Sequence, residues 1–135
     1  MKSKLLVFPL LLCLWLSACG GKSPSTKINV ALGDFQFTPN ELIVPAGQEI
    51  AFAAVNNGAV LHDFVIMKAG ADAGPLFEDN DVPNVYWEVE LVPGAEVNTR
   101  FTAPTEPGEY QVICRTEGHI ASGMIAKLIV VAGDR

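Results

Sequence analysis

Four side chains of this 135-residue sequence belong to types that together bind a redox-active metal. Three of them share one short segment, with the spacing Cys114-x4-His119-x4-Met124, and the fourth, His62, precedes Cys114 by 52 residues. A thiolate, two imidazoles and a thioether favour a copper ion that cycles between two oxidation states, with two His and one Cys in a plane and a weak axial Met. The sequence therefore predicts one mononuclear copper site.

Each of these residues, taken alone, has an ordinary structural explanation. A single His on a strand is usually structural, a buried Cys packs as a small apolar side chain, and a Met after a loop usually joins the core. Taken together these explanations are weak, because both histidines of the chain and its one cysteine after Cys19 fit the same ligand set. A lone thiol in an oxidising compartment also needs an explanation, since it cannot form an internal disulfide.

The elements that must position these residues read as short strands separated by Pro and Gly turn signals. The expected strand segments are residues 30–37, 42–44, 50–54, 64–67, 86–91, 97–101, 110–114 and 124–131. About eight short strands in a single domain predict an all-β fold, an antiparallel sandwich or barrel.

The ligand spacing agrees with this arrangement. Cys114 ends one expected strand and Met124 opens the next, so the residues between them form a loop at one end of the sandwich, with His119 at its tip. Gly118 and Gly123 stand beside ligands, where a tightly curved backbone often needs a positive φ. His62 follows a turn that should lie at the same end.

The ligand loop resembles that of the cupredoxins, the type 1 blue copper proteins, in the pattern of rusticyanin, auracyanin and sulfocyanin. Neighbouring motifs share the resemblance, which covers residues 27–131: Phe35-x-Phe37-x-Pro39, Val44-x-Ala46-Gly47, Asn56-Asn57-Gly58 and Pro107-Gly108-Glu109-Tyr110. The resemblance implies a Greek-key β-sandwich with one copper ion cycling between Cu(I) and Cu(II). His62, Cys114 and His119 would form its trigonal plane, and Met124 would be axial.

Two departures from the family pattern lie next to the expected ligands. Many relatives carry Asn directly after the first His, where this chain has Asp63, and a carboxylate there should favour oxidised copper. Relatives also often have Pro-Gly-His where this chain has Glu117-Gly118-His119. Asp63 and Thr116 are the residues expected to support the ligands from behind.

The expected function is single-electron transfer between redox proteins, such as a cytochrome or a membrane electron-transfer complex, by a monomer that is not an enzyme. Electrons would enter and leave through the exposed edge of His119. An apolar contact surface for partners would surround it, made up of Ala59, Val60, Leu61, Ile120 and Ala121. The alternative for these five residues is ordinary packing within the loops. Copper storage or delivery with the same ligands is the alternative function. Copper oxidases need further histidines, a binuclear site needs a second loop Cys, and a Cys–His hydrolase needs an orienting third group.

The amino-terminal residues predict export and a membrane anchor. Lys2 and Lys4 precede an apolar run over 5–16 that is too short to span a bilayer, as in a secretory signal peptide. Leu16-Ser17-Ala18-Cys19 resembles the bacterial lipobox, in which the Cys is lipidated; an ordinary signal peptide is the alternative. The expected organisation is a signal peptide over 1–18, a flexible tether over 19–26 and a cupredoxin-like domain over 27–135. The mature protein is expected to be anchored to a bacterial membrane, in the periplasm or on the outer cell face.

The charge distribution excludes one class of partner. Seven basic and 15 acidic residues follow position 18, so the expected mature chain has a formal net charge of −8. Nucleic-acid binding requires basic residues to neutralise phosphates and is therefore not expected. An acidic segment over 68–93 interrupts the regular strand spacing. It is either a solvated insertion or a docking surface for a cationic partner, and it is expected to lie away from the copper site.

Overall fold

The computed structural model describes residues 22–133. The expected signal peptide and Cys19 lie outside these residues. Within them, no helix has the length and apolar character needed to cross a membrane.

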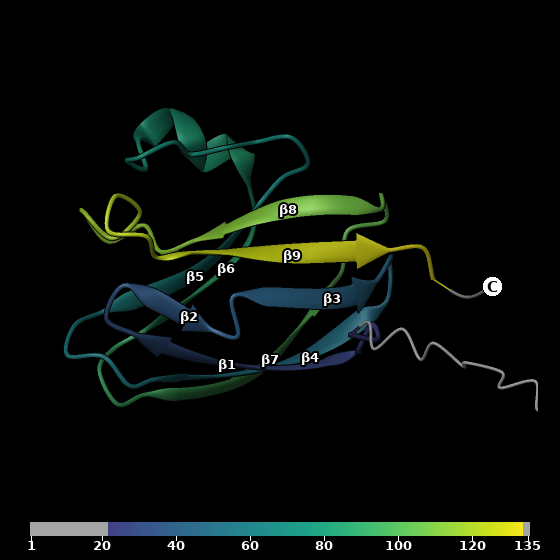
Figure 1. Cartoon of the computed structure of the whole chain (residues 1–135), viewed down its shortest axis with the longest axis horizontal. Coiled ribbons are helices and arrows are strands. Elements are labelled where there is room, and N and C mark those ends of the chain that lie inside the picture. Colours follow the sequence, from purple (N-terminus) through teal and green to yellow (C-terminus); the bar gives the residue numbers. More distant parts are fainter. Residues whose placement is uncertain (1–21, 134–135) are drawn as a thin grey trace, which may run out of the picture.

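Two β-sheets packed face to face make up the described domain (Figure 1). The four strands of the first sheet are, in spatial order, β2 (Gln36–Thr38), β1 (Lys27–Gly33), β4 (Glu49–Asn56) and β7 (Glu96–Thr102). The five of the second are β3 (Glu41–Pro45), β9 (Ile125–Val131), β8 (Gly108–Ile113), β5 (His62–Met67) and β6 (Val85–Leu91). A 3-10 helix, η1 (Asp79–Asn84), precedes β6.

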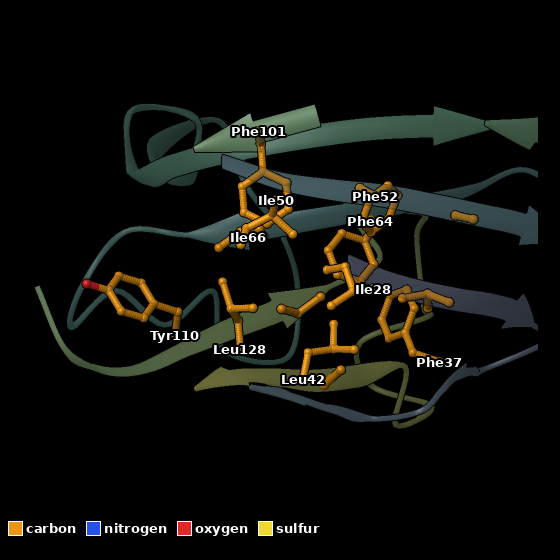
Figure 2. Close-up of a cluster of buried hydrophobic side chains, with 14 of the residues drawn as sticks. Ile28, Phe37, Leu42, Ile50, Phe52, Phe64, Ile66, Phe101, Tyr110 and Leu128 are labelled. Carbon is orange, nitrogen blue, oxygen red and sulfur yellow. The ribbon is translucent and has the colours of Figure 1, made fainter. Parts of the chain in front are cut away.

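The main core lies between the two sheets and follows from period-two alternation along the strands. In β4, every second residue from Ile50 to Asn56 is buried, and β9 buries Ala126, Leu128 and Val130 in the same way. Aromatic rings fill the middle of the sandwich, where Phe64 meets Phe52 at a ring-centroid distance of 4.8 Å (Figure 2). This packing gives the site at the end of the sandwich a rigid support.

The expected all-β sandwich is confirmed, and the structure adds the strand pairing. Most neighbouring strands run antiparallel, but β1 pairs parallel with β4, and β3 pairs parallel with β9. Alternation in the sequence indicates which face of a strand is buried and carries no information on which strand lies beside it. The single strand expected over 30–37 is divided into β1 and β2 by a turn in which Phe35 has a φ of +64°.

One end of the sandwich collects the expected ligands. β5 begins there, β8 ends there and β9 begins there, so the loop between β8 and β9 projects from this end, on the left of Figure 1. The β1–β2 turn and the β4–β5 connection lie at the same end. β1 begins and β9 ends at the opposite end of the domain (Figure 1).

The segment between β5 and β6 folds back onto the outer face of the second sheet. Its Ala73 is buried in a second apolar cluster with Val65, Met67, Ile113 and Ile120. The amide of Ala73 donates to Gln111 Oε1 at 3.0 Å and holds the segment against β8. Ile120 of the β8–β9 loop belongs to the same cluster, so part of the segment packs on the sheet face that also carries one residue of that loop. As expected, the segment contributes none of the candidate ligands His62, Cys114 and His119.

Candidate metal centre

The structure brings His62, Cys114 and His119 together at the end of the sandwich. Their candidate ligand atoms all lie within 4.8 Å of one another. Cys114 Sγ is 3.8 Å from Nδ1 of His62 and 3.4 Å from Nδ1 of His119. His62 and Cys114 are fully buried, and His119 is 7% exposed. A buried Cys sulfur facing two imidazole nitrogens offers the donor types that suit a single copper ion.

Met124 is connected to this group through the backbone. Its amide donates to the carbonyl of His119 at 2.9 Å, and its carbonyl accepts from the amide of Cys114 at 3.4 Å. The side chain is fully buried in the main core. Met124 therefore packs in the same core as Cys114 and is tied by its backbone to both Cys114 and His119.

The β8–β9 loop is held in its curved shape by its own hydrogen bonds. The amides of His119 and Gly123 donate to the carbonyls of Thr116 and Ile120, at 3.0 and 2.9 Å. Gly118 and Gly123 have φ values of +80° and +93°, as expected from the sequence. These bonds hold the loop in the shape that places Cys114, His119 and Met124 at one end of the sandwich.

Asp63 supports the candidate ligands mainly through its backbone. Its amide donates to Cys114 Sγ at 3.3 Å, a bond that stabilises a thiolate. Burial raises the pKa of the Asp63 carboxyl, and Arg115, whose Nε lies 3.4 Å from Oδ1, acts in the opposite direction. Thr116 donates its hydroxyl to the carbonyl of Leu61 at 3.0 Å and joins the loop to the residue before His62. The structure therefore places Asp63 and Thr116 beside the expected ligands.

Asn56 shapes the approach to His62, which sequence reasoning did not anticipate. Its buried side chain donates to the carbonyls of Val60 and Leu91, both at 2.8 Å, and accepts from the amide of Gly58 at 2.8 Å. The Asn-Asn-Gly motif indicated a turn. The motif does not indicate that the side chain of Asn56 is buried and bonds to β6, because that bond is made to Leu91, 35 residues later in the chain.

The apolar surface around His119 differs from the expected one. Ala59, Val60 and Ala121 are exposed and Leu61 is half-buried, but Ile120 is only 5% exposed and packs in the second apolar cluster. Ile120 therefore does not belong to the contact surface, because the segment after β5 covers it.

Phe35 takes a place in this surface that the sequence did not predict. It is 49% exposed, and its ring meets that of His119 edge-on at a centroid distance of 5.3 Å. Its φ of +64° places it in a turn and not in the single strand that the sequence predicted over residues 30–37. Burial lowers the pKa of His119, with a further contribution from His62, which favours the neutral imidazole that binds a metal.

Comparison with known proteins agrees with this geometry. The family described as Cupredoxin-like domain matches residues 6–130. The reduced auracyanin of Roseiflexus castenholzii superposes with a TM-score of 0.69 at 31% identity, over 81% of this chain and 99% of that one. Plastocyanin of Mercurialis perennis is 30% identical over 73% of this chain and 90% of its own length.

A third relative is the copper-resistant cuproprotein CopI of Rubrivivax gelatinosus, 26% identical over 76% of this chain. This chain spans 65% of the length of CopI, slightly less than two thirds. The family match covers both sheets and the ligand loop, and the buried His, Cys, His and Met side chains suit the metal that cupredoxins hold. The chain belongs to the cupredoxin family, and its cofactor is one copper ion.

Proposed function

We propose that this protein carries single electrons between redox partners outside the cytoplasm, with copper held by His62, Cys114, His119 and Met124. The observation that supports this most is the placement of the candidate ligands. They are buried at one end of a rigid sandwich, and one imidazole, that of His119, reaches the edge of an exposed apolar surface.

Bound copper would supply the Cu(I)/Cu(II) couple. The protein contributes a buried donor set that the hydrogen bonds of the loop and the packing of the core hold in place. Donors that move little between two oxidation states keep the reorganisation cost of electron exchange low. The amide of Asp63 donates a hydrogen bond to the Cys114 sulfur and fixes its position.

The contact surface for partners, in this proposal, is the end patch, defined here as Phe35, Ala59, Val60 and Ala121. All four are exposed and belong to turns and loops at this end of the domain, where the ring of Phe35 packs against the imidazole of His119. A small apolar area suits brief contact, and a partner seated on it would come close to a metal ligand. The net charge of the mature domain would favour encounter with a basic partner, an effect that salt reduces.

We expect Val60→Glu to slow electron exchange with a protein partner at both low and high salt. Val60 is 46% exposed in the end patch, so a charge there must be desolvated whenever a partner docks. Stopped-flow exchange rates measured across a salt series test this expectation.

Val82→Glu is the matched control, because Val82 is 56% exposed on η1, within the acidic segment. It adds the same charge and should change the rate only at low salt. A charge reversal in the same segment, Asp79→Lys, would test the acidic surface directly. Glu78 and Asp81 are left unchanged because they form the capping box of η1. If Val82→Glu slows exchange at every salt concentration and Val60→Glu has no effect, the docking surface lies on the acidic segment.

Copper storage or delivery is the second candidate function, and the similarity to the copper-resistant cuproprotein CopI favours it. It uses the same ligands and differs in what leaves the site, an electron or the ion. The buried position of the four side chains argues against easy transfer of the ion, because a receiving protein would have to reach donors that are almost inaccessible.

We further propose that the chain is exported through residues 1–18 and anchored by lipid on Cys19, positions outside the described residues. The amide of Ser25 donates to the carbonyl of Ile43, and the carbonyl of Thr26 accepts from Ala51, so the domain already begins before β1. This start lies at the end opposite the end patch (Figure 1). An anchor there would leave the patch free to meet partners.

Cys19→Ala should abolish the anchor, since the substituted residue can no longer be acylated. In the native host, we expect the variant protein in the soluble extracytoplasmic fraction and the unchanged protein in the membrane fraction. Mass spectrometry of the amino terminus of the membrane-extracted protein gives the direct readout. An unmodified terminus at another residue would exclude the lipid anchor and leave the copper assignment intact.

A further inference from the structure

The turn between β1 and β2 contacts both candidate imidazole ligands, although it precedes His62 by more than 25 residues. Phe35 packs its ring against His119, and Asp34 directs its carboxylate to the other imidazole: Oδ1 of Asp34 lies 3.4 Å from Nε2 of His62. The second contact concerns the face of His62 that points away from the candidate metal position.

The two nitrogens of His62 have different surroundings. Nδ1 lies on the side of the Cys114 sulfur and is the atom placed to bind copper. Nε2 is buried, and among the described residues it has no formed hydrogen bond. A neutral imidazole that binds a metal through one nitrogen carries its proton on the other. The buried Nε2–H then needs an acceptor, since an unpaired buried donor is costly.

Asp34 is fixed in a position to be that acceptor. Its Oδ1 also accepts a hydrogen bond from the amide of Ala59 at 3.1 Å, which holds the carboxylate against the connection that leads to His62. Gly58 leaves the space between them open, because a Cβ there would clash with Nε2 of His62 and would lie 2.6 Å from Oδ1 of Asp34. The side chain of Asp34 is 51% exposed, so a small shift can shorten the 3.4 Å contact to a hydrogen bond.

We propose that Asp34 is a positioning residue for the copper site, its carboxylate accepting a hydrogen bond from Nε2–H of His62. This inference rests on the proposed role of His62 as a ligand. A carboxylate behind a metal-bound imidazole fixes its tautomer and ring orientation and makes its ligating nitrogen more basic. A stronger donor and a nearby negative charge both stabilise Cu(II) more than Cu(I), so Asp34 lowers the reduction potential of the site.

Asp34→Ala and Asp34→Asn test the proposal, with Glu117→Gln as the matched control. Glu117 is an exposed carboxylate of the ligand loop, close to His119 in sequence. We expect Asp34→Ala to weaken Cu(II) binding by about 10- to 100-fold, the usual effect of removing such a partner, and Cu(I) binding by less. Each tenfold preferential loss of Cu(II) affinity raises the potential of a one-electron couple by about 59 mV. Asp34→Asn, which keeps an oxygen acceptor without the charge, should have a smaller effect in the same direction.

A copper-free readout separates this proposal from the function itself. In the apo protein at alkaline pH, NMR should show the His62 Nε2 proton protected from exchange and shifted downfield by the carboxylate. Both features should be lost in Asp34→Ala and unchanged in Glu117→Gln. The proposal is overturned if the Asp34 variants match Glu117→Gln in copper affinity, potential and the His62 proton signal. Failure of the unchanged protein to bind copper would instead refute the proposed function, whatever the apo spectrum shows.

Discussion

We expect Cys114→Ser to abolish the intense visible absorption of the oxidised, copper-loaded protein. That band requires a bond between a thiolate and copper, and Cys114 is the sole cysteine in the described residues. The substitution exchanges one sulfur for one oxygen at a fully buried position, so the fold should be retained. The visible spectrum measures the loss, and far-ultraviolet circular dichroism of the apo variant checks the fold.

Met124→Leu is the control that distinguishes the sulfur of Cys114 from the sulfur of Met124. Both residues are fully buried in the same core. An exchange of Met for Leu nearly conserves volume and should cost less than about 1.5 kcal/mol. The Leu variant should keep both copper and colour and show a higher potential, because a weak axial donor to Cu(II) is lost. A coloured Cys114→Ser protein, or a Met124→Leu protein that cannot hold copper, would contradict the assigned ligand roles.

The second large effect concerns Ile120, which joins the ligand loop to the segment after β5. Ile120→Ala should lower the free energy of unfolding of the apo protein by about 2–5 kcal/mol, the range for removing a buried aliphatic side chain. Its side chain is 5% exposed and packs with Val65, Met67, Ala73 and Ile113. Urea unfolding of the apo variant and the unchanged protein measures the difference.

Ile125→Ala makes the same chemical change at an exposed position. Ile125 is 39% exposed and directly follows Met124, so it is equally close to a ligand in sequence. Its replacement should change stability by much less than that of Ile120. Equal effects of the two substitutions would mean that the segment does not cover Ile120 in solution. Ile120 would then belong to the exposed surface, as the sequence first suggested.

Features that depend on residue type and local spacing could be read from the sequence. The alternation of Ile50, Phe52 and Ala54 indicated a strand with one buried face, and the structure buries all three. The spacing of Cys114, His119 and Met124 indicated a loop between two strands, and β8 and β9 flank it as expected. Turn signals and the donor types of the ligands are local properties of the sequence, so they can be recognised without knowledge of the fold.

Features that depend on contacts between distant segments could not be read in this way. Ile120 was expected to be exposed because it lies in a loop, yet a segment about 45 residues earlier folds back to cover it. Asp34 belongs to no recognisable motif. Its contact with His62 exists only because the β1–β2 turn of one sheet and the start of β5 in the other sheet come together in the fold. Phe35 fits the pattern of a strand in the sequence, but its positive φ places it in the turn between β1 and β2.

The central claim is that the copper stays in the site while electrons pass through it. Repeated electrochemical cycling of the purified soluble domain, with copper and protein quantified after each series in the presence of a strong Cu(I) chelator, tests this claim most directly. The account predicts a reversible one-electron couple and a copper-to-protein ratio that remains at one. Loss of copper to the chelator on reduction would contradict electron carriage and identify the protein as one that delivers the ion.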